Sequence, residues 1–310
     1  MFGKYIAIAC LAATGFAATP PCPRIHKVAP GDTLAGLAGF YLGDQDYASA
    51  ILVATNSRTS EKGLSFIRTP FSLSGVAGVC IPDAQEAQRS HARYATYQKA
   101  VSGMAVTQPW QVAAGWLVVF QPGEAIHVAS WTRAGKYKMG TNTLQSDMWV
   151  TVAPHLQDFC KKFFSDHNAD EDELTLRLEQ RLGLPPAAGY TTIAVVNLIP
   201  TAANIFRPCS DPSTSADNCT WGGPTAGVSA TYKAWFNNQY FGAYGAPTPN
   251  LYPWTSLGYT FDWSQKSDGE FERIGESEFV IPAGTEVNVV GLPATAQYCS
   301  ATAPISRAPR

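Results

Sequence analysis

The chain has 310 residues, with 22 lysines and arginines and 24 aspartates and glutamates, for a formal net charge of −2. The two signs are mixed along the chain, which excludes a basic face for nucleic acid and a polybasic segment for an anionic membrane surface. A chain of this length can form one small module and one larger domain, each with its own core.

The N-terminus is typical of a secretory signal peptide spanning residues 1–17. Lys4 precedes an apolar run, Tyr5 to Ala13, that is too short to span a bilayer, and small residues stand at Gly15 and Ala17. We expect cleavage after Ala17, export to the periplasm, cell envelope or extracellular space, and no transmembrane segment. A lipoprotein cleavage at Cys10 is rejected, because the apolar run before it would be too short.

Six cysteines follow the signal segment, and an even number in an exported chain indicates disulfides formed in an oxidising compartment. The spacing alone leaves 15 pairings open for six cysteines. The domain organisation described below favours three pairs: Cys22 with Cys80, Cys209 with Cys219, and Cys160 with Cys299. None of the spacings is C-x-x-C, so no zinc site is expected.

The segment from His26 to Pro82 predicts the order strand, helix, helix, strand. A short strand at 26–28 precedes a Pro-Gly turn, and Asp32 can cap a helix whose apolar residues recur at helical spacing. A second helix is expected from Tyr47 to Thr55, with Asn56 at its end. The segment closes with the strand VCIP.

These features resemble a LysM module. In that family an opening strand leads into G-D-T-L, then L-A-x-x-Y and G-D, then a helix ending in A-x-N and a strand ending in I-P. The matching residues here are Gly31, Asp32, Thr33, Leu34, Leu37, Ala38, Tyr41, Gly43, Asp44, Ile51, Ala54, Asn56, Ile81 and Pro82. The second half departs from the family, because the glycine-rich GLSFIRTPFSLSGVAGV replaces the usual short turn.

The resemblance implies binding of N-acetylglucosamine-containing glycans such as peptidoglycan. The first helix would expose free backbone N–H groups at its start, and the longer segment would form the facing wall. The residues expected to contact glycan are Gly31, Asp32, Thr33, Leu34, Asn56, Phe66 and Ile67. The alternative is that Asp32 and Thr33 only cap the helix and that Leu34 is only a core residue.

Residues 83–103 are rich in alanine and polar helix formers, with almost no apolar stripe. This composition predicts a solvated linker helix between the module and the rest of the chain.

Residues 104–299 mix strand and helix signals. Runs of β-branched and aromatic residues predict six strands, at 116–120, 126–131, 148–152, 191–199, 257–263 and 277–282. Pro154 starts one helix, and Asp170 with Glu173 forms a capping box at the start of a second. Helices grouped between strands favour an α+β domain. The loop between Pro208 and Pro224 is expected to be closed by the Cys209–Cys219 disulfide.

Residue patterns for catalysis are weak in this larger domain. Alternation places Tyr259, Phe261 and Trp263 on one strand face, which we interpret as core. Asp262, Glu276 and Glu278 could supply a carboxylate pair for glycoside hydrolysis, but a solvated face is the preferred interpretation. His127 is interpreted as a partly buried structural histidine. No peptidase, serine hydrolase or metalloprotease motif is present.

The run DHNADEDELTLR alternates oxygen donors but lacks the glycine and glutamate that a calcium loop requires, since Glu171 and Arg177 hold those positions. Neither a metal nor a cofactor is therefore expected.

Three hypotheses remain. The first is an exported cell-envelope protein that binds peptidoglycan through residues 26–82 and carries a structural or interaction domain. The second is a cell-wall glycoside or peptide hydrolase that the same module targets. The third, a eukaryotic chitin-binding effector, is suggested by the cysteines and the Asn218-Cys219-Thr220 sequon but disfavoured because no internal cysteines frame the helices of the module.

Overall fold

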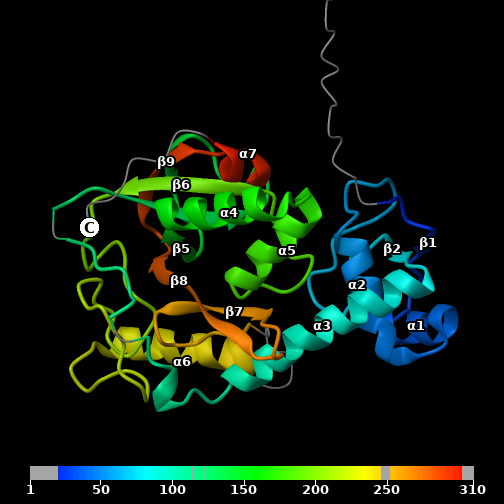
Figure 1. The fold of residues 1–310 in the computed structure, drawn as a ribbon, viewed down its shortest axis with the longest axis horizontal. Helices are drawn as coiled ribbons and strands as arrows, with labels where there is room; N and C mark the ends of the chain where they lie inside the picture. Colours follow the sequence, from blue (N-terminus) through cyan, green and yellow to red (C-terminus); the bar gives the residue numbers. More distant parts are fainter. Residues whose placement is uncertain (1–19, 114, 122, 246–251, 302–310) are drawn as a thin grey trace, which may run out of the picture.

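The computed structural model describes residues 20–113, 115–121, 123–245 and 252–301. The expected signal segment, residues 1–17, lies outside this part. Among the described residues there are two antiparallel sheets, one of two strands and one of seven, together with helices on both. The α+β class is thus confirmed. Figure 1 shows the small sheet and its helices at one side of the molecule, joined to the larger part by one long helix.

The N-terminal module, residues 22–82, has the predicted element order. Its strands pair antiparallel, with Arg24 opposite Ile81 and Lys27 opposite Gly78. The elements are β1 Arg24–Lys27, α1 Leu34–Leu42, a 3₁₀ turn Gln45–Tyr47, α2 Ala48–Asn56 and β2 Gly78–Ile81. The inner faces of α1 and α2 form one core together with side chains from the segment before β2.

The cap of α1 is Thr33, whose Oγ1 accepts from the Gly36 N–H at 3.0 Å. The sequence favoured Asp32, which instead lies one position too early and accepts from the Ala29 N–H at 2.7 Å. At the other end, Gly43 adopts φ 81°, a left-handed conformation that ends the helix without a side-chain clash.

The linker helix is present as α3, Ala84–Met104, but the prediction of a solvated helix is wrong. One face is buried along its length, with Tyr94 in the core of the N-terminal module and Tyr97 against Trp263 of the larger domain. Small residues on this face, Ala87 and Ala100, allow close packing and conceal the apolar stripe in the sequence. The helix therefore joins the two parts by packing on both.

The larger domain is built on the seven-stranded sheet, in the order β4-β9-β6-β3-β5-β8-β7. Its strands are β3 Ile126–Thr132, β4 Gly140–Thr143, β5 Met148–Val152, β6 Thr192–Leu198, β7 Tyr259–Gln265, β8 Phe271–Ile281 and β9 Glu286–Gly291. Its helices are a 3₁₀ turn Pro109–Gln111, α4 Ala153–His167, α5 Glu171–Arg181, α6 Ala230–Tyr244 and α7 Thr295–Ser300. Five of the six predicted strands and both predicted helices are confirmed.

Residues 116–120 form no strand, although their composition favours one. The backbone N–H groups of Leu117 and Phe120 donate to Asp217 and Thr214, and that of Val118 donates to the Ser277 hydroxyl. This segment covers the sheet as a loop, and burial explains its apolar residues.

The two faces of the sheet have different cores. One face carries Val128, Val150 and Phe279 and is covered by loops that include Phe120 and Ile205. The opposite face carries Ala129, Trp131 and Ile193 and is covered by α4, α5 and α7. In Figure 1, α5 lies above β7 and α6 below it. Residues of α6 pack with Trp149 of β5, on the same sheet face as Ala129.

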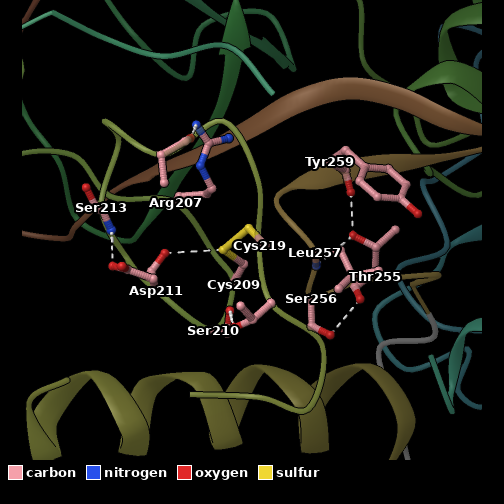
Figure 2. The surroundings of a disulfide bond; sticks show 12 residues. Arg207, Cys209, Ser210, Asp211, Ser213, Cys219, Thr255, Ser256, Leu257 and Tyr259 are labelled. Atoms are coloured by element: carbon pink, nitrogen blue, oxygen red, sulfur yellow. Dashed lines mark hydrogen bonds between the residues drawn. A yellow bond between two sulfur atoms is a disulfide. The ribbon is translucent and has the colours of Figure 1, made fainter. Parts of the chain in front are cut away.

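All three predicted disulfides are present: Cys22–Cys80, Cys160–Cys299 and Cys209–Cys219. Figure 2 shows the third, which closes a loop beside the turn at Thr255–Leu257 and beneath Arg207. Arg207 is fully buried; its Nη2 donates to the Val118 carbonyl at 2.6 Å and its guanidinium lies over the Phe279 ring. Burial lowers the pKa of Arg207 to about 10.

Candidate functional site

The exposed residues of the predicted glycan site lie at the start of α1. Gly31 has φ 94°, and Thr33 is exposed. The Asp32 carboxylate accepts from the Ala29 N–H and lies 2.9 Å from His26 Nε2, whose other ring nitrogen lies 3.0 Å from the Tyr41 hydroxyl. The hydrogen bond from His26 holds the pKa of Asp32 below its usual range. The Asp32 side chain is therefore held in one orientation.

Three other predicted contact residues have buried side chains. Leu34 and Ile67 belong to the module core. Asn56 donates to the Ile67 carbonyl at 3.0 Å and accepts from the Ile67 N–H at 2.8 Å. Asn56 thus anchors the long segment that precedes β2. Because the side chains of Leu34, Asn56 and Ile67 are buried, a ligand could contact these residues only at their backbone atoms.

Phe66 lies between the two parts of the molecule. The Arg133 guanidinium is stacked 4.0 Å from the Phe66 ring centre, and an added Cβ at Gly189 would lie only 2.6 Å from the same ring. Close approach of Gly189 therefore places this ring against the larger domain.

The segment 64–77 runs beside the start of α1. The Val28 N–H donates to the Ala77 carbonyl at 3.1 Å, and Leu73 and Val76 pack in the same cluster as Leu34. This segment also carries Phe71, an exposed aromatic residue that was not among the predicted contacts. The sequence analysis missed Phe71 as a candidate contact residue. Its solvent exposure is the feature that suggests such a role, and the residue pattern does not show which side chains are exposed.

A second candidate site is a cavity of about 700 Å³ in the larger domain. It lies on the sheet face that α4 and α5 cover, and α6 and the segment before β7 complete its wall. Seven aromatic residues line it: Trp131, Trp149, Tyr190, Tyr252, Trp254, Tyr259 and Phe261. Its size is within the usual range for small-molecule sites.

Three polar atoms in the cavity wall are buried and have no hydrogen-bond partner in the described part of the chain. They are Thr151 Oγ1, Glu278 Oε2 and Trp254 Nε1. Thr151 on β5 and Glu278 on β8 are register partners, so both point to the same face. Buried polar groups are normally paired, and unpaired ones are frequent where a ligand binds.

Glu278 is one of two carboxyl groups in the wall of this cavity; the other, Asp147, accepts from Trp235 and Ala283. Burial raises the pKa of Glu278 to about 8, since a charged carboxylate is poorly solvated there. At neutral pH the group is mainly protonated and can donate a hydrogen bond.

The other two carboxylates of the predicted cluster have different environments, and the interpretation as a solvated face is wrong. Asp262 is fully buried and accepts from Arg177 at 2.7 and 3.1 Å. Glu276 is buried and accepts from Arg181 Nε at 2.7 Å. Both carboxylates are therefore part of ion pairs between α5 and the β7–β8 hairpin. As predicted, Tyr259, Phe261 and Trp263 are core residues.

His127 is partly buried on β3, with Nε2 3.1 Å from Asn197 Nδ2 on the neighbouring strand. It is not part of the cavity wall.

The raised pKa of Glu278 also predicts that the stability of the protein depends on pH. The ordinary carboxyl pKa of 4.5 rises to about 8 on folding, so the folded state holds the proton more tightly. This stabilisation is complete below about pH 4.5 and is lost as the pH rises towards 8. Glu179, buried and also raised to about 8, contributes in the same window.

We expect the free energy of unfolding of the parent to fall between pH 5 and pH 8, and Glu278→Gln to reduce that fall by on the order of 1–3 kcal/mol. Urea unfolding at several pH values measures both. If the free energy of unfolding falls with pH equally in the parent and in Glu278→Gln, the pKa of Glu278 is not raised by burial.

No protein-family model, curated protein or solved structure matches the chain.

Proposed function

We propose that this protein is exported to the cell envelope and binds peptidoglycan, or another N-acetylglucosamine polymer, through the N-terminal module. The observation that carries the proposal is the exposed Gly31-Asp32-Thr33 turn at the start of α1, beside the segment 64–77. The G-D-T-L motif and its LysM resemblance supply the ligand class.

The chemistry of this surface suits an acetamido sugar. The first N–H groups of a helix have no partner within the helix, so the start of α1 can donate to carbonyl and hydroxyl oxygens. Asp32, held by His26 and the Ala29 N–H, presents a fixed acceptor beside them. Phe71 offers an exposed ring that could pack on the apolar face of a sugar.

Export is supported by the disulfides. Three formed pairs are typical of proteins from oxidising compartments. No described helix is long and apolar enough to cross a membrane.

The test is co-sedimentation of the chain without residues 1–17 with insoluble peptidoglycan and, separately, chitin. We expect Phe71→Ala to weaken binding about tenfold, a typical loss for an aromatic contact residue. Phe40→Ala is the matched control, because Phe40 is an exposed ring on α1, 80% accessible, outside segment 64–77. Equal binding by both variants and the parent would exclude Phe71, and no binding by the parent to either polymer would overturn the proposal.

A second variant tests the start of α1. Asp32→Ala with Thr33→Ala is expected to weaken glycan binding and to cost about 1 kcal/mol of stability through the lost cap. Thr33→Ser keeps the capping oxygen and should retain stability. If the double variant binds muropeptides like the parent at equal folded fraction, the glycan does not contact this turn.

Hydrolysis in the larger domain is the second candidate function. Glycoside hydrolases generally use two carboxyl groups on either side of the scissile bond. In the described part of the chain the cavity wall has two carboxyl groups: Glu278, with an unpaired oxygen, and Asp147, whose two oxygens already accept from Trp235 and Ala283. Asp262 and Glu276 lie outside the wall and are bound to arginines. The geometry therefore favours binding, and release of muropeptides in the same sedimentation assay would favour hydrolysis.

A further inference from the structure

The cavity of the larger domain has polar groups that the protein itself does not satisfy. Thr151 and Trp254 are only 4% and 7% accessible, yet Thr151 Oγ1 and Trp254 Nε1 lack partners among the described residues. Glu278 Oε2 is the third such atom, and all three belong to the wall of one cavity. They come from β5, β8 and the segment before β7, so three distant parts of the chain converge there. Leaving such groups unsatisfied is costly, so water or a ligand in the cavity has to supply the missing partners.

Besides Glu278, three charged side chains line the wall: Arg133, Lys136 and Asp147. Asp147 accepts from Trp235 Nε1 at 2.7 Å and from the Ala283 N–H at 2.9 Å. Arg133 donates to the Ala188 carbonyl at 3.2 Å and stacks on Phe66. Lys136 is exposed, with its ammonium 5.2 Å from the Tyr137 ring centre. The buried side-chain atoms of the wall that lack a partner among the described residues are a hydroxyl oxygen, an indole nitrogen and a carboxyl oxygen.

The remaining groups select a neutral, hydroxyl-rich ligand. A buried ionic ligand requires an opposite charge that is itself out of water, but Arg133 and Lys136 are exposed and Asp147 already accepts two hydrogen bonds. A sugar offers both donors and acceptors to Thr151, Trp254 and Glu278. Its apolar C–H faces match aromatic walls such as those of Trp131 and Tyr252.

We propose that this cavity is a binding site for a neutral saccharide, in which Thr151, Glu278 and Trp254 bind sugar hydroxyl or carbonyl groups and the surrounding aromatic residues pack on the rings. The site is separate from the glycan surface of the N-terminal module and does not depend on it. The contact of Arg133 with Phe66 places the cavity wall directly beside that module.

Tryptophan fluorescence separates the two sites. All eight tryptophans lie after residue 104, and none is in the N-terminal module. Trp131, Trp149 and Trp254 line the cavity. A sugar in the cavity should therefore change the emission, whereas a sugar bound only at the start of α1 should be seen by calorimetry without this change.

The experiment titrates the full chain without residues 1–17 with N,N′-diacetylchitobiose and cellobiose, using fluorescence and calorimetry in parallel. We expect a saturable fluorescence change with at least one of them. Thr151→Val and Trp254→Phe should each weaken this binding about tenfold, because each removes one hydrogen-bonding group. Glu278→Gln should bind at least five times more tightly than Glu278→Leu. Trp116→Phe, at a residue 74% accessible and outside the wall, controls for the loss of a tryptophan.

Three results would overturn the proposal. One is the absence of a fluorescence change with both sugars up to 50 mM. A second is an unchanged fluorescence-detected affinity in Thr151→Val and Trp254→Phe with folding confirmed by circular dichroism. The third is a response to choline but not to sugar that Glu278→Gln abolishes, because this would show a cation site. Failure of peptidoglycan binding with intact cavity binding would refute only the proposed function of the N-terminal module.

Discussion

Replacing Asp262 with alanine is expected to lower the free energy of unfolding by about 3–5 kcal/mol, the usual cost of removing one partner from a buried ion pair. The Asp262 side chain is fully buried and accepts from both terminal nitrogens of Arg177, and it lies 3.6 Å from Arg181 Nη1. It also accepts from the Ser264 hydroxyl at 2.7 Å. Removing the Asp262 carboxylate would leave the largely buried guanidinium groups of Arg177 and Arg181 without this counter-charge.

Urea unfolding monitored by circular dichroism measures this loss. Glu272→Ala is the matched control, because Glu272 is an exposed carboxylate on the same hairpin and should change stability by less than about 0.5 kcal/mol. A loss below about 1 kcal/mol for Asp262→Ala would mean that the pair contributes little. The variant also bears on the cavity, since the pair joins α5 to β7, and Leu182, Thr260 and Phe261 at these elements line its wall.

Removing the Cys160–Cys299 disulfide is expected to destabilise the protein more than removing Cys209–Cys219. The first pair is separated by 139 residues and the second by 10. The chain-entropy relation gives about 5 kcal/mol for the long loop and about 3 kcal/mol for the short one, a difference of about 2 kcal/mol. All four cysteines are buried, so alanine pairs at the two sites lose similar packing.

The comparison uses Cys160→Ala with Cys299→Ala against Cys209→Ala with Cys219→Ala, in urea at one temperature. Titration of thiols in the parent without residues 1–17, and therefore without Cys10, provides the control, and we expect none to react without denaturant and reductant. Equal destabilisation of the two double variants would show that chain entropy does not govern these bonds. Free thiols in the native parent would contradict the disulfide framework.

Local patterns predicted those elements whose stability comes from neighbouring residues. The capping box of Asp170 with Glu173 is formed, and Pro154 lies at the start of α4. Strand alternation correctly assigned Trp263 and Phe261 to the core. These predictions succeed because caps, periodicity and alternation act over a few residues.

The same reasoning failed where burial depends on distant partners. Asp262 alternates with Phe261 and Trp263, so the local pattern predicts a solvent-facing side chain, but two arginines of α5 cover it. The alanine-rich α3 has little apolar character, yet Tyr97 is buried against Trp263. In both cases a partner distant in the chain, α5 for Asp262 and β7 for Tyr97, determines the environment.

The sequence by itself determined the element order of the N-terminal module and the α+β class, because these depend on local spacing. It carries the LysM resemblance, and the organisation of the chain favoured the three cysteine pairs without fixing them. Only the tertiary structure decided the cavity. Thr151 and Glu278 are opposite each other because β5 pairs with β8, and Trp254 joins them from another segment. Strand register between segments more than 100 residues apart is set by packing of the whole core, and no local pattern encodes it.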